Sequence, residues 1–439
     1  MPPKRRPKGL SLDTSAVNAE TKDELAESFN ATVNTFTKIT KAKDGHGSEV
    51  ISVGNKGAII VTHQQDEGKL GEEGVGTPGS TGQATSTPTK HARSGEIDPD
   101  KLILGKELGR GASSYVQLVT EKDTERRLAL KVMNVFDKNM RSQLLREFNL
   151  LFHCDCDALV KFHGAFYKEG KISVALEYMD RGSLDVVMRK ARINSIAEYE
   201  LLKARKGEES EEGEEERRRA HGLIPEQVLA AITFQCLWGL SYLKHEHRLH
   251  RDIKPQNVLL NKQGFVKLTD FGISKELENS IGKCMTIVGT FKYMSPERIL
   301  GKGYSYPADI WSLGLMLIEC ATGKYPFIHA GSMIEMAQTV TESEPPKLTP
   351  ERLYSDSFHD FINACMKNNP ADRETAYELL GYKWLSEHNA NSMRKCQDIV
   401  RDYFQEEKNK KKRIQKMQRE LLKGGRGDEE DERTSSSHK

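Results

Sequence analysis

The 439-residue sequence has no long apolar run. None of its segments approaches the ~20 consecutive apolar residues that a helix needs to cross a bilayer, and the first 30 residues lack the apolar core of a signal peptide. We therefore expect a soluble, intracellular chain with no membrane span.

The sequence also has few cysteines and a small net charge. The seven cysteines are scattered and show no paired spacing, as is typical of free thiols in a reducing compartment. Charged residues make up 30% of the chain, yet the formal net charge is only +2. A protein that binds nucleic acid along its whole surface carries a stronger basic balance, so we expect no nucleic-acid partner.

The first 96 residues have little sustained apolar periodicity. Residues 71–95 are rich in Gly, Ser, Thr and Pro, which bury too little surface to offset the entropy lost on ordering. The sequence predicts that region 1–96 is largely disordered. One short run, VISVGNKGAIIV at 50–61, has strand-forming residues around a turn and predicts a hairpin.

The pattern changes at Leu102. Segments 102–120 and 127–136 are β-rich with turn signals, and 140–152 has the apolar spacing of a helix. Beyond 172–179 the chain turns mainly helical, with expected helices at 228–245, 308–323 and 357–368. The sequence therefore predicts an α+β domain over 97–385, with a small β-rich lobe at 102–175 and a larger helical lobe at 176–385.

Two further segments are very polar. Residues 191–222 form a low-complexity insertion with an acidic block, which we interpret as a solvated surface loop, the alternative being a landing site for a basic partner. The tail at 386–439 is charged and in part compatible with a helix. Its few apolar residues could pack back on the domain: Ile399, Val400, Tyr403 and Phe404.

A glycine turn joins the first two expected strands. Gly109 and Gly111 lack side chains, so the backbone amides of the turn can approach phosphate groups. Ser114 replaces the last glycine of the usual Gly-x-Gly-x-x-Gly pattern, and a strand rather than a helix follows. This order argues against a dinucleotide-binding fold.

A lysine ends the next strand pattern. Lys131 could hold nucleotide phosphates as a point charge, provided that a carboxylate holds the lysine in turn. Glu147, on the expected helix, faces inward between Leu144 and Leu151. We expect Lys131 and Glu147 to form an ion pair.

Three ordered motifs carry the strongest chemical signal. They are His250-Arg251-Asp252-Ile253-Lys254-Pro255-Gln256-Asn257, Asp270-Phe271-Gly272 and Ser295-Pro296-Glu297. Phosphoryl transfer requires cations and positioning more than covalent chemistry. We expect Asp252 to orient the substrate hydroxyl and accept its proton, and Lys254 to steady the γ-phosphate. We also expect Asn257 and Asp270 to supply oxygen ligands for Mg²⁺.

These motifs resemble those of protein kinases, and the resemblance covers residues 102–385. It implies a bilobal fold, with ATP in the cleft between the lobes and a hinge near Leu176–Met179. The residues that would line the nucleotide site are Leu108, Gly109, Arg110, Gly111, Ala112, Ser113, Ser114, Tyr115, Val116, Ala129, Lys131, Glu177 and Met179. The departures, at Ser114 and Ser295, involve neither the metal ligands nor the base.

The segment after Gly272 resembles the MAP kinase kinases, most closely those of plants and protists. Val288-Gly289-Thr290 and the run from Tyr293 to Arg298 match the pattern of that family. The resemblance implies ATP and Mg²⁺ as cofactors, a MAP kinase activation loop with Thr-x-Tyr as substrate, and a MAP kinase kinase kinase as activator. It also implies that Ser280 and Thr286, spaced as in plant members, are phosphorylated, and Arg251 is a cation that could pair with such a phosphate.

The N-terminal run KRRPKGLSL resembles the docking peptide of the same family. Lys4, Arg5 and Arg6 form a basic block ahead of Leu10 and Leu12. In extended backbone both leucines point to one side, where they could enter adjacent pockets of a MAP kinase. The alternative is a solvated basic end.

Two other functions remain open at this point. One is a kinase acting one tier higher, like a MAP kinase kinase kinase, and the other is a signalling scaffold with little activity. For the MAP kinase kinase that the resemblance implies, we expect a monomeric catalytic domain in the cytoplasm, with the nucleus as a second compartment.

Overall fold

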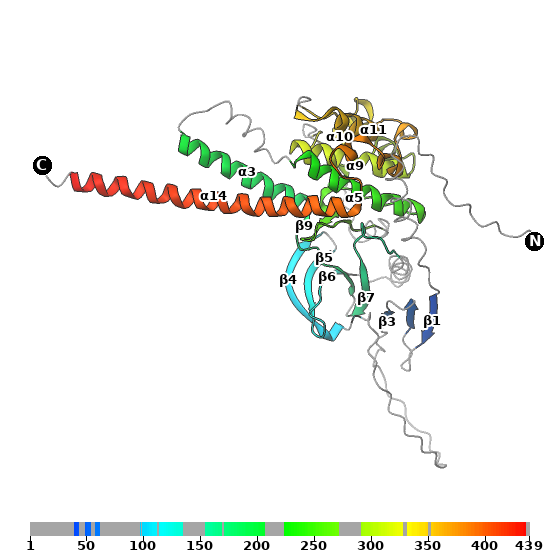
Figure 1. The fold of residues 1–439 in the computed structure, drawn as a ribbon. Helices are drawn as coiled ribbons and strands as arrows, with labels where there is room; N and C mark the ends of the chain where they lie inside the picture. Colours follow the sequence, from blue (N-terminus) through cyan, green and yellow to red (C-terminus); the bar gives the residue numbers. More distant parts are fainter. Residues whose placement is uncertain are drawn as a thin grey trace, which may run out of the picture. The chain divides into compact units, whose positions relative to one another are not determined.

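A computed structural model describes residues 39–43, 49–53, 58–61, 97, 99–111, 114–134, 154–168, 171–206, 224–271, 291–327, 332–349 and 353–435. The chain divides into two compact units (Figure 1). The β unit holds residues 36–154 and 161–178, and the helical unit holds 155–160 and 179–439. Together they give the expected α+β, bilobal protein-kinase fold.

A five-stranded antiparallel sheet forms the centre of the β unit, in the order β4-β5-β6-β8-β7. Its strands are β4 (Leu102–Arg110), β5 (Ser114–Glu121), β6 (Arg127–Asn134), β7 (Phe162–Lys168) and β8 (Lys171–Glu177), and η2 (Pro99–Lys101) precedes them. Leu128, Leu130 and Val132 alternate along β6 and bury one face with Val119. This period of two, present in the sequence, is what places Lys131 on the opposite face.

A smaller sheet precedes the five-stranded one. Strands β1 (Ile39–Lys43), β2 (Glu49–Val53) and β3 (Ala58–Val61) pair in sequence order, and β3 contacts β7 at the edge of the larger sheet. The β2–β3 pair is antiparallel, with Val50 opposite Ile60. The hairpin predicted over 50–61 is therefore present, within a region for which the composition predicts disorder.

The helical unit is built around two buried helices. Sixteen consecutive residues of α5 (Glu226–His245), from Val228 to Leu243, are buried, and so is most of α9 (Tyr306–Thr322). The remaining elements are α3 (Leu184–Lys206), η3 (Pro255–Asn257), α8 (Pro296–Ile299), α10 (Met333–Glu342), α11 (Asp356–Cys365), η5 (Pro370–Asp372), α12 (Ala376–Leu379), α13 (Lys383–Glu387) and α14 (Met393–Ser435). Over the described residues, no helix combines the length and apolar character needed to cross a membrane.

Aromatic packing joins the last short helices to this core. Phe358 of α11 stacks on Trp384 of α13 with ring centroids 4.2 Å apart, and both side chains are fully buried. Buried aromatic pairs of this kind contribute roughly 0.5–1.5 kcal/mol beyond the area they bury. Ser355 caps α11 by accepting a hydrogen bond from the amide of Phe358, so the helix begins where the sequence supplies a cap.

A three-stranded sheet carries the chemically important segment of the helical unit. Its order is β11-β10-β9, with β9 (Gly182–Ser183), β10 (Val258–Leu260) and β11 (Val266–Leu268). Strand β10 starts directly after Asn257, and β11 ends two residues before Asp270. The pairing of β10 with β11 therefore holds the backbones of Asn257 and Asp270 near each other.

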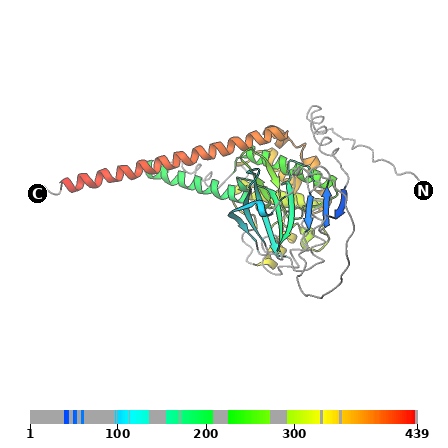
Figure 2. The same cartoon turned by 90° about the horizontal axis from the view of Figure 1, so that it is seen from below.

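Helices α3 and α14 lie side by side and extend away from the rest of the helical unit (Figures 1 and 2). Asn194 donates to Glu407 (3.0 Å), Lys410 donates to Ser195 (2.9 Å), and Arg413 pairs with Glu198 (3.5 Å). Residue numbers rise together along both helices, so the pair is parallel. We call this pair the helical arm.

The inner face of α14 repeats every three and four residues. It consists of the buried or half-buried Val400, Tyr403, Glu407, Lys410, Ile414 and Met417. This spacing keeps one stripe of α14 on its packed side, where the helix contacts α5 and α3, as in a coiled coil. The predicted tail helix is present, and Val400 and Tyr403 pack back on the domain as expected.

The arm changes the interpretation of the polar insertion. Its first part, 191–206, continues α3 as a helix, whereas the low-complexity composition had indicated a surface loop from 191 onward. The reason is tertiary, because α14 supplies the partner that a polar helix needs. The helix predicted at 140–152 lies outside the described residues.

We expect the polar seam of the arm to depend on its central ion pair. Lys410 and Glu198 lie 3.0 Å apart with about four fifths of each side chain buried. Lys410→Glu should destabilise the arm by about 1–2 kcal/mol, because two carboxylates then face each other in a partly desolvated seam. Combining it with Glu198→Lys should recover most of that loss. Hydrogen exchange of residues 405–421 measures both effects.

Lys416→Glu is the matched control, because the Lys416 side chain is 80% exposed and pairs with Glu420 on its own helix. Equal loss of protection in the Lys416 and Lys410 variants would contradict a specific role for the seam.

Candidate active site

The glycine turn lies between β4 and β5, as the sequence predicted. Gly109 pairs with Val116 across the two strands, and the amide of Gly111 donates to the carbonyl of Ser114 (2.7 Å). The guanidinium of Arg110 lies over the ring of Tyr115, 5.5 Å from its centroid. A strand, β5, and not a helix follows the glycine turn.

Lys131 lies in the middle of the sheet. It is paired with Val116 on β5 and with Val174 on β8, and its side chain is buried. Leu118 and Leu176 flank Ala129 in the same way two residues earlier. The sheet thus brings Gly109, Val116, Ala129 and Lys131 together on adjacent strands, although they come from separate motifs.

The end of β8 forms the last predicted part of the nucleotide site. The amide of Glu177 donates to the carbonyl of Lys161 (2.8 Å), and its carboxylate accepts from the Lys161 amide (3.2 Å). The β unit ends at Tyr178, and Met179, which is buried, belongs to the helical unit. The predicted hinge therefore coincides with the change from one unit to the other.

Asp252 is held by two neighbours from its own loop. Its Oδ2 accepts a hydrogen bond from Lys254 Nζ (2.7 Å) and another from Asn257 Nδ2 (2.9 Å). Asn257 Nδ2 also donates to the carbonyl of Asp252 (2.8 Å). A positioned carboxylate beside a cation is the arrangement needed to orient a hydroxyl and offset negative charge.

Asp309 of α9 anchors the loop that carries Asp252. The buried carboxylate of Asp309 accepts from the amides of His250 (3.0 Å) and Arg251 (2.9 Å), and also from the Tyr304 hydroxyl. These bonds hold Arg251 at φ +69, a left-handed conformation that is costly for a side chain other than glycine.

His250 is a neutral element of the same loop. Burial lowers the pKa of its imidazole, and the nearby carboxylates of Asp309, Asp252 and Asp270 offset this only in part. Its Nδ1 accepts from the amide of Asp252 (3.3 Å), and its ring lies 6.4 Å from that of Phe271. A neutral His250 can keep accepting this bond, which helps to fix the backbone of Asp252.

Asn257 and Asp270 fit the requirements of Mg²⁺. Both Asn257 hydrogens are directed at Asp252, so its amide oxygen faces the other way. The amide of Thr269 donates to the carbonyl of Asn257 (3.0 Å), which ties Asp270, at φ +62, to the same place. Mg²⁺ typically takes one or two protein oxygens and keeps phosphate and water as its other ligands.

The Ser-Pro-Glu motif is fixed by a buried ion pair. Arg373 donates from Nη1 and Nη2 to the two carboxylate oxygens of Glu297, at 2.7 Å each. Burial alone would raise the pKa of Glu297, but the hydrogen bonds and charge of Arg373 outweigh it and lower the pKa. Removing one partner of such a pair costs about 3–5 kcal/mol, because it leaves an uncompensated buried charge.

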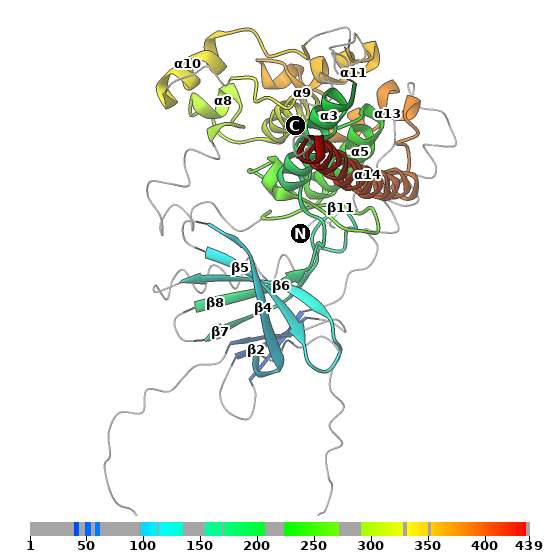
Figure 3. The same cartoon turned by 90° about the vertical axis from the view of Figure 1, so that its left-hand side faces the viewer.

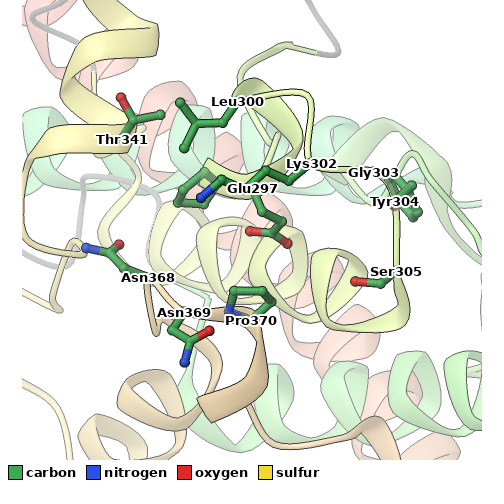
Figure 4. Close-up of a pocket in the computed structure, with 11 residues that line it drawn as sticks. Glu297, Leu300, Lys302, Gly303, Tyr304, Ser305, Thr341, Asn368, Asn369 and Pro370 are labelled. Atoms are coloured by element: carbon green, nitrogen blue, oxygen red, sulfur yellow. The ribbon is translucent and has the colours of Figure 1, made fainter.

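A pocket of about 520 Å³ opens beside this motif (Figure 4). It is lined by Glu297, Leu300 and Tyr304 together with Thr341 of α10 and Asn368. The side chain of Leu300 is more than half exposed at its edge. Its lining combines polar side chains with the apolar Leu300, and none of the lining residues is among those predicted to bind nucleotide.

Several predicted site residues lie outside the described part of the chain. They are the glycine-turn residues Ala112 and Ser113, the ion-pair partner Glu147, the activation-loop residues Ser280 and Thr286, and the docking residues Lys4, Arg5, Arg6, Leu10 and Leu12.

Sequence reasoning missed the residues that support the site from a distance. Asp309 and Arg373 are charged groups, and the motif residues that they bind, His250, Arg251 and Glu297, lie more than 55 residues away along the chain. A signal for Asp309 was nevertheless present, because a carboxylate near the start of the apolar run ADIWSLGLMLIECATG must find buried partners.

Comparison with known proteins agrees with this geometry. Residues 102–385 match the family described as "Protein kinase domain". The chain is 43% identical over 285 residues to Mitogen-activated protein kinase kinase 3 of Arabidopsis thaliana, covering 64% of this chain but only 49% of that relative. It is 35% identical over 333 residues to Mitogen-activated protein kinase kinase 1 of the same plant, covering 74% and 85%.

An animal protein gives a similar match. The chain is 35% identical over 317 residues to Dual specificity mitogen-activated protein kinase kinase dSOR1 of Drosophila melanogaster, covering 66% of this chain and 72% of the relative. All three relatives are named as mitogen-activated protein kinase kinases. The chain is an ATP- and Mg²⁺-dependent protein kinase and belongs to the MAP kinase kinase family.

Proposed function

We propose that this kinase activates a MAP kinase by transferring the γ-phosphate of ATP to a threonine and a tyrosine of its activation loop. The observation that carries the proposal is the arrangement around Asp252, whose carboxylate is held 2.7 Å from Lys254 Nζ and 2.9 Å from Asn257 Nδ2. The proposed substrate class rests on the names of the relatives, which are mitogen-activated protein kinase kinases.

In this mechanism Asp252 orients the attacking hydroxyl and takes its proton. The Lys254 ammonium, beside the same carboxylate, faces the negative charge that develops on the transferred group. Asn257 and Asp270 would hold Mg²⁺, which shields the phosphate charge when it is bound. Lys131 supplies a second cation from the β unit, and Glu147 is its proposed partner. The glycine turn, from Leu108 to Val116, would cover the phosphates with its backbone.

The intact residue set argues against the scaffold interpretation. Lys131, Asp252 and Asp270 are all present, and a catalytically idle relative typically lacks at least one of them. The alternative of a kinase one tier higher loses support, because the relatives reported above are MAP kinase kinases.

We further propose that phosphorylation of Ser280 and Thr286 by a MAP kinase kinase kinase activates the enzyme. Two cations support this. The guanidinium groups of Arg251 and Arg298 lie over the same Tyr304 ring, 5.9 and 4.7 Å from its centroid, and the Arg251 side chain is exposed. A phosphate carries a charge of about −1.5 to −2 at neutral pH and bonds strongly to such arginines. It would thereby order the loop next to Asp252.

The first prediction tests the chemistry. Wild-type enzyme should place phosphate on both the threonine and the tyrosine of a catalytically inactive MAP kinase, as mass spectrometry can show. Asp270→Ala and Lys131→Met should each lower the steady-state rate at least about 10²-fold while the thermal unfolding midpoint changes little, because each removes a transition-state interaction. More than about a tenth of the activity in either variant would contradict these roles.

The second prediction concerns control. Ser280→Asp with Thr286→Asp should raise the activity of the unphosphorylated enzyme, though less than phosphate does, because aspartate carries less charge. Adding Arg251→Ala should remove most of that gain. Full activity in the variant with alanine at both positions would rule these two hydroxyls out of the activation mechanism.

The third prediction concerns substrate docking by the N-terminal segment. Leu10→Ala with Leu12→Ala should raise the KM for the MAP kinase at least about threefold and leave phosphorylation of a generic protein unchanged, since each leucine could bury apolar surface worth up to ~1.5–3 kcal/mol. Charge reversal at Arg5 and Arg6 should also weaken binding, and added salt should weaken the wild-type interaction. A basic tail with no docking role would be indifferent to the leucines.

A further inference from the structure

Helix α14 begins eight residues after the end of the shared kinase domain, yet its first part is buried in the helical unit. Cys396 and Val400 are fully buried, Tyr403 is nearly so, and the guanidinium of Arg181 lies 5.1 Å from the centroid of the Phe404 ring. Figure 3, which looks nearly along α14, shows α3 and α5 beside it. This segment of α14 is therefore part of the packed unit and not an appendage.

The closest approach of α14 is to the turn between β10 and β11. At Gly264 a Cβ would lie 1.9 Å from the carbonyl oxygen of Gln397, a distance that no side chain tolerates. Gly264 also has φ +93, which only glycine adopts readily. The backbone of α14 thus rests directly on the backbone of the turn, and a glycine is required for both reasons.

A buried glutamine forms hydrogen bonds with the same turn. Gln235 of α5 donates to the carbonyl of Gly264 (3.2 Å) and accepts from the amide of Val266 (2.9 Å). Asp180 accepts from the amide of Lys262 (2.7 Å). The turn is thus held by contacts from α14, from Gln235 and from Asp180.

The turn connects directly to the metal-ligand residues. Strand β10 leads back from it to Asn257, and β11 leads forward from it to Asp270. The two strands pair from Val258 opposite Leu268 to Leu260 opposite Val266, and Thr269 is bonded to Asn257. A shift of the turn therefore moves both ligands, because only a short paired hairpin separates them from it.

We propose that α14 is a positioning element for the Asn257–Asp270 metal-ligand pair, acting through its backbone contact with Gly264. The functional catalytic unit then extends past residue 385, to about the end of the buried part of α14 at Phe404. The proposal concerns the arrangement of these ligands and does not depend on which protein the kinase phosphorylates.

The test uses Gly264→Ala in the full chain, with Gly303→Ala as the matched control. Gly303 has φ +92, so alanine there meets the same backbone strain, but no atom lies within 4 Å of its Cβ position. Hydrogen exchange of residues 393–405 reports release of α14, and electron paramagnetic resonance titration of Mn²⁺ with a non-hydrolysable ATP analogue reports the ligand pair.

We expect Gly264→Ala to speed exchange in 393–405 about tenfold or more and to weaken Mn²⁺ binding about tenfold, as loss of an outer supporting contact typically does. Gly303→Ala should do neither. Unchanged exchange in Gly264→Ala, or faster exchange with unchanged Mn²⁺ affinity, would overturn the proposal.

A second variant releases α14 without touching the hairpin, in case the alanine at 264 prevents folding. Val400→Glu places a charge at a fully buried position of α14, and Gln415→Glu adds the same charge at an exposed position of the same helix. Val400→Glu should also weaken Mn²⁺ binding, and Gln415→Glu should not. If Val400→Glu frees α14 and the Mn²⁺ affinity stays at the wild-type value, α14 has only a packing role.

Discussion

The geometry of the catalytic loop depends on one buried carboxylate. Asp309 accepts hydrogen bonds from two successive amides, those of His250 and Arg251, and thereby holds a left-handed residue directly before Asp252. Hydrogen bonds to an ionised group contribute about 1.5–3 kcal/mol each, enough to offset the strain of that conformation. The bonds of Lys254 and Asn257 to Asp252 arrange the loop internally, and the bonds to Asp309 tie that arrangement to α9.

The anchor is effective because α9 is rigid. Almost all of this helix is buried, and it ends at Gly323 in a left-handed cap whose amide donates to Glu319. Besides Asp309, the helix supports the segment before the Ser-Pro-Glu motif, since Ser312 donates to the carbonyl of Tyr293 and the Tyr293 hydroxyl donates to Glu319. One apolar helix with a few satisfied polar groups thus positions two functional loops.

Helix α14 lies beyond the shared kinase domain, and its contacts with the β10–β11 turn and with α3 also hold distant segments together. The buried part of α14 packs on the turn at Gly264, while its distal part is paired with α3 through Asn194, Lys410 and Glu198. A polar seam fixes the register of two helices more strictly than an apolar one, because a slip leaves half-buried charges unpaired. These contacts therefore fix the position of α14 relative to the β10–β11 hairpin.

The sequence by itself determined the fold class and the β-rich and helical halves, and it predicted site roles for Lys131, Asp252, Lys254, Asn257 and Asp270. These residues sit in short motifs whose spacing carries the chemistry, so local order along the chain is sufficient. It also indicated the hairpin at 50–61 and the tail helix. Only the tertiary structure decided that Asp309 anchors the catalytic loop, that Arg373 pairs with Glu297, and that residues 191–206 are helical against α14. Each of these depends on segments far apart in the chain meeting in a buried place, where an unpaired charge or amide is costly, and no local pattern of residues records which partner will be there.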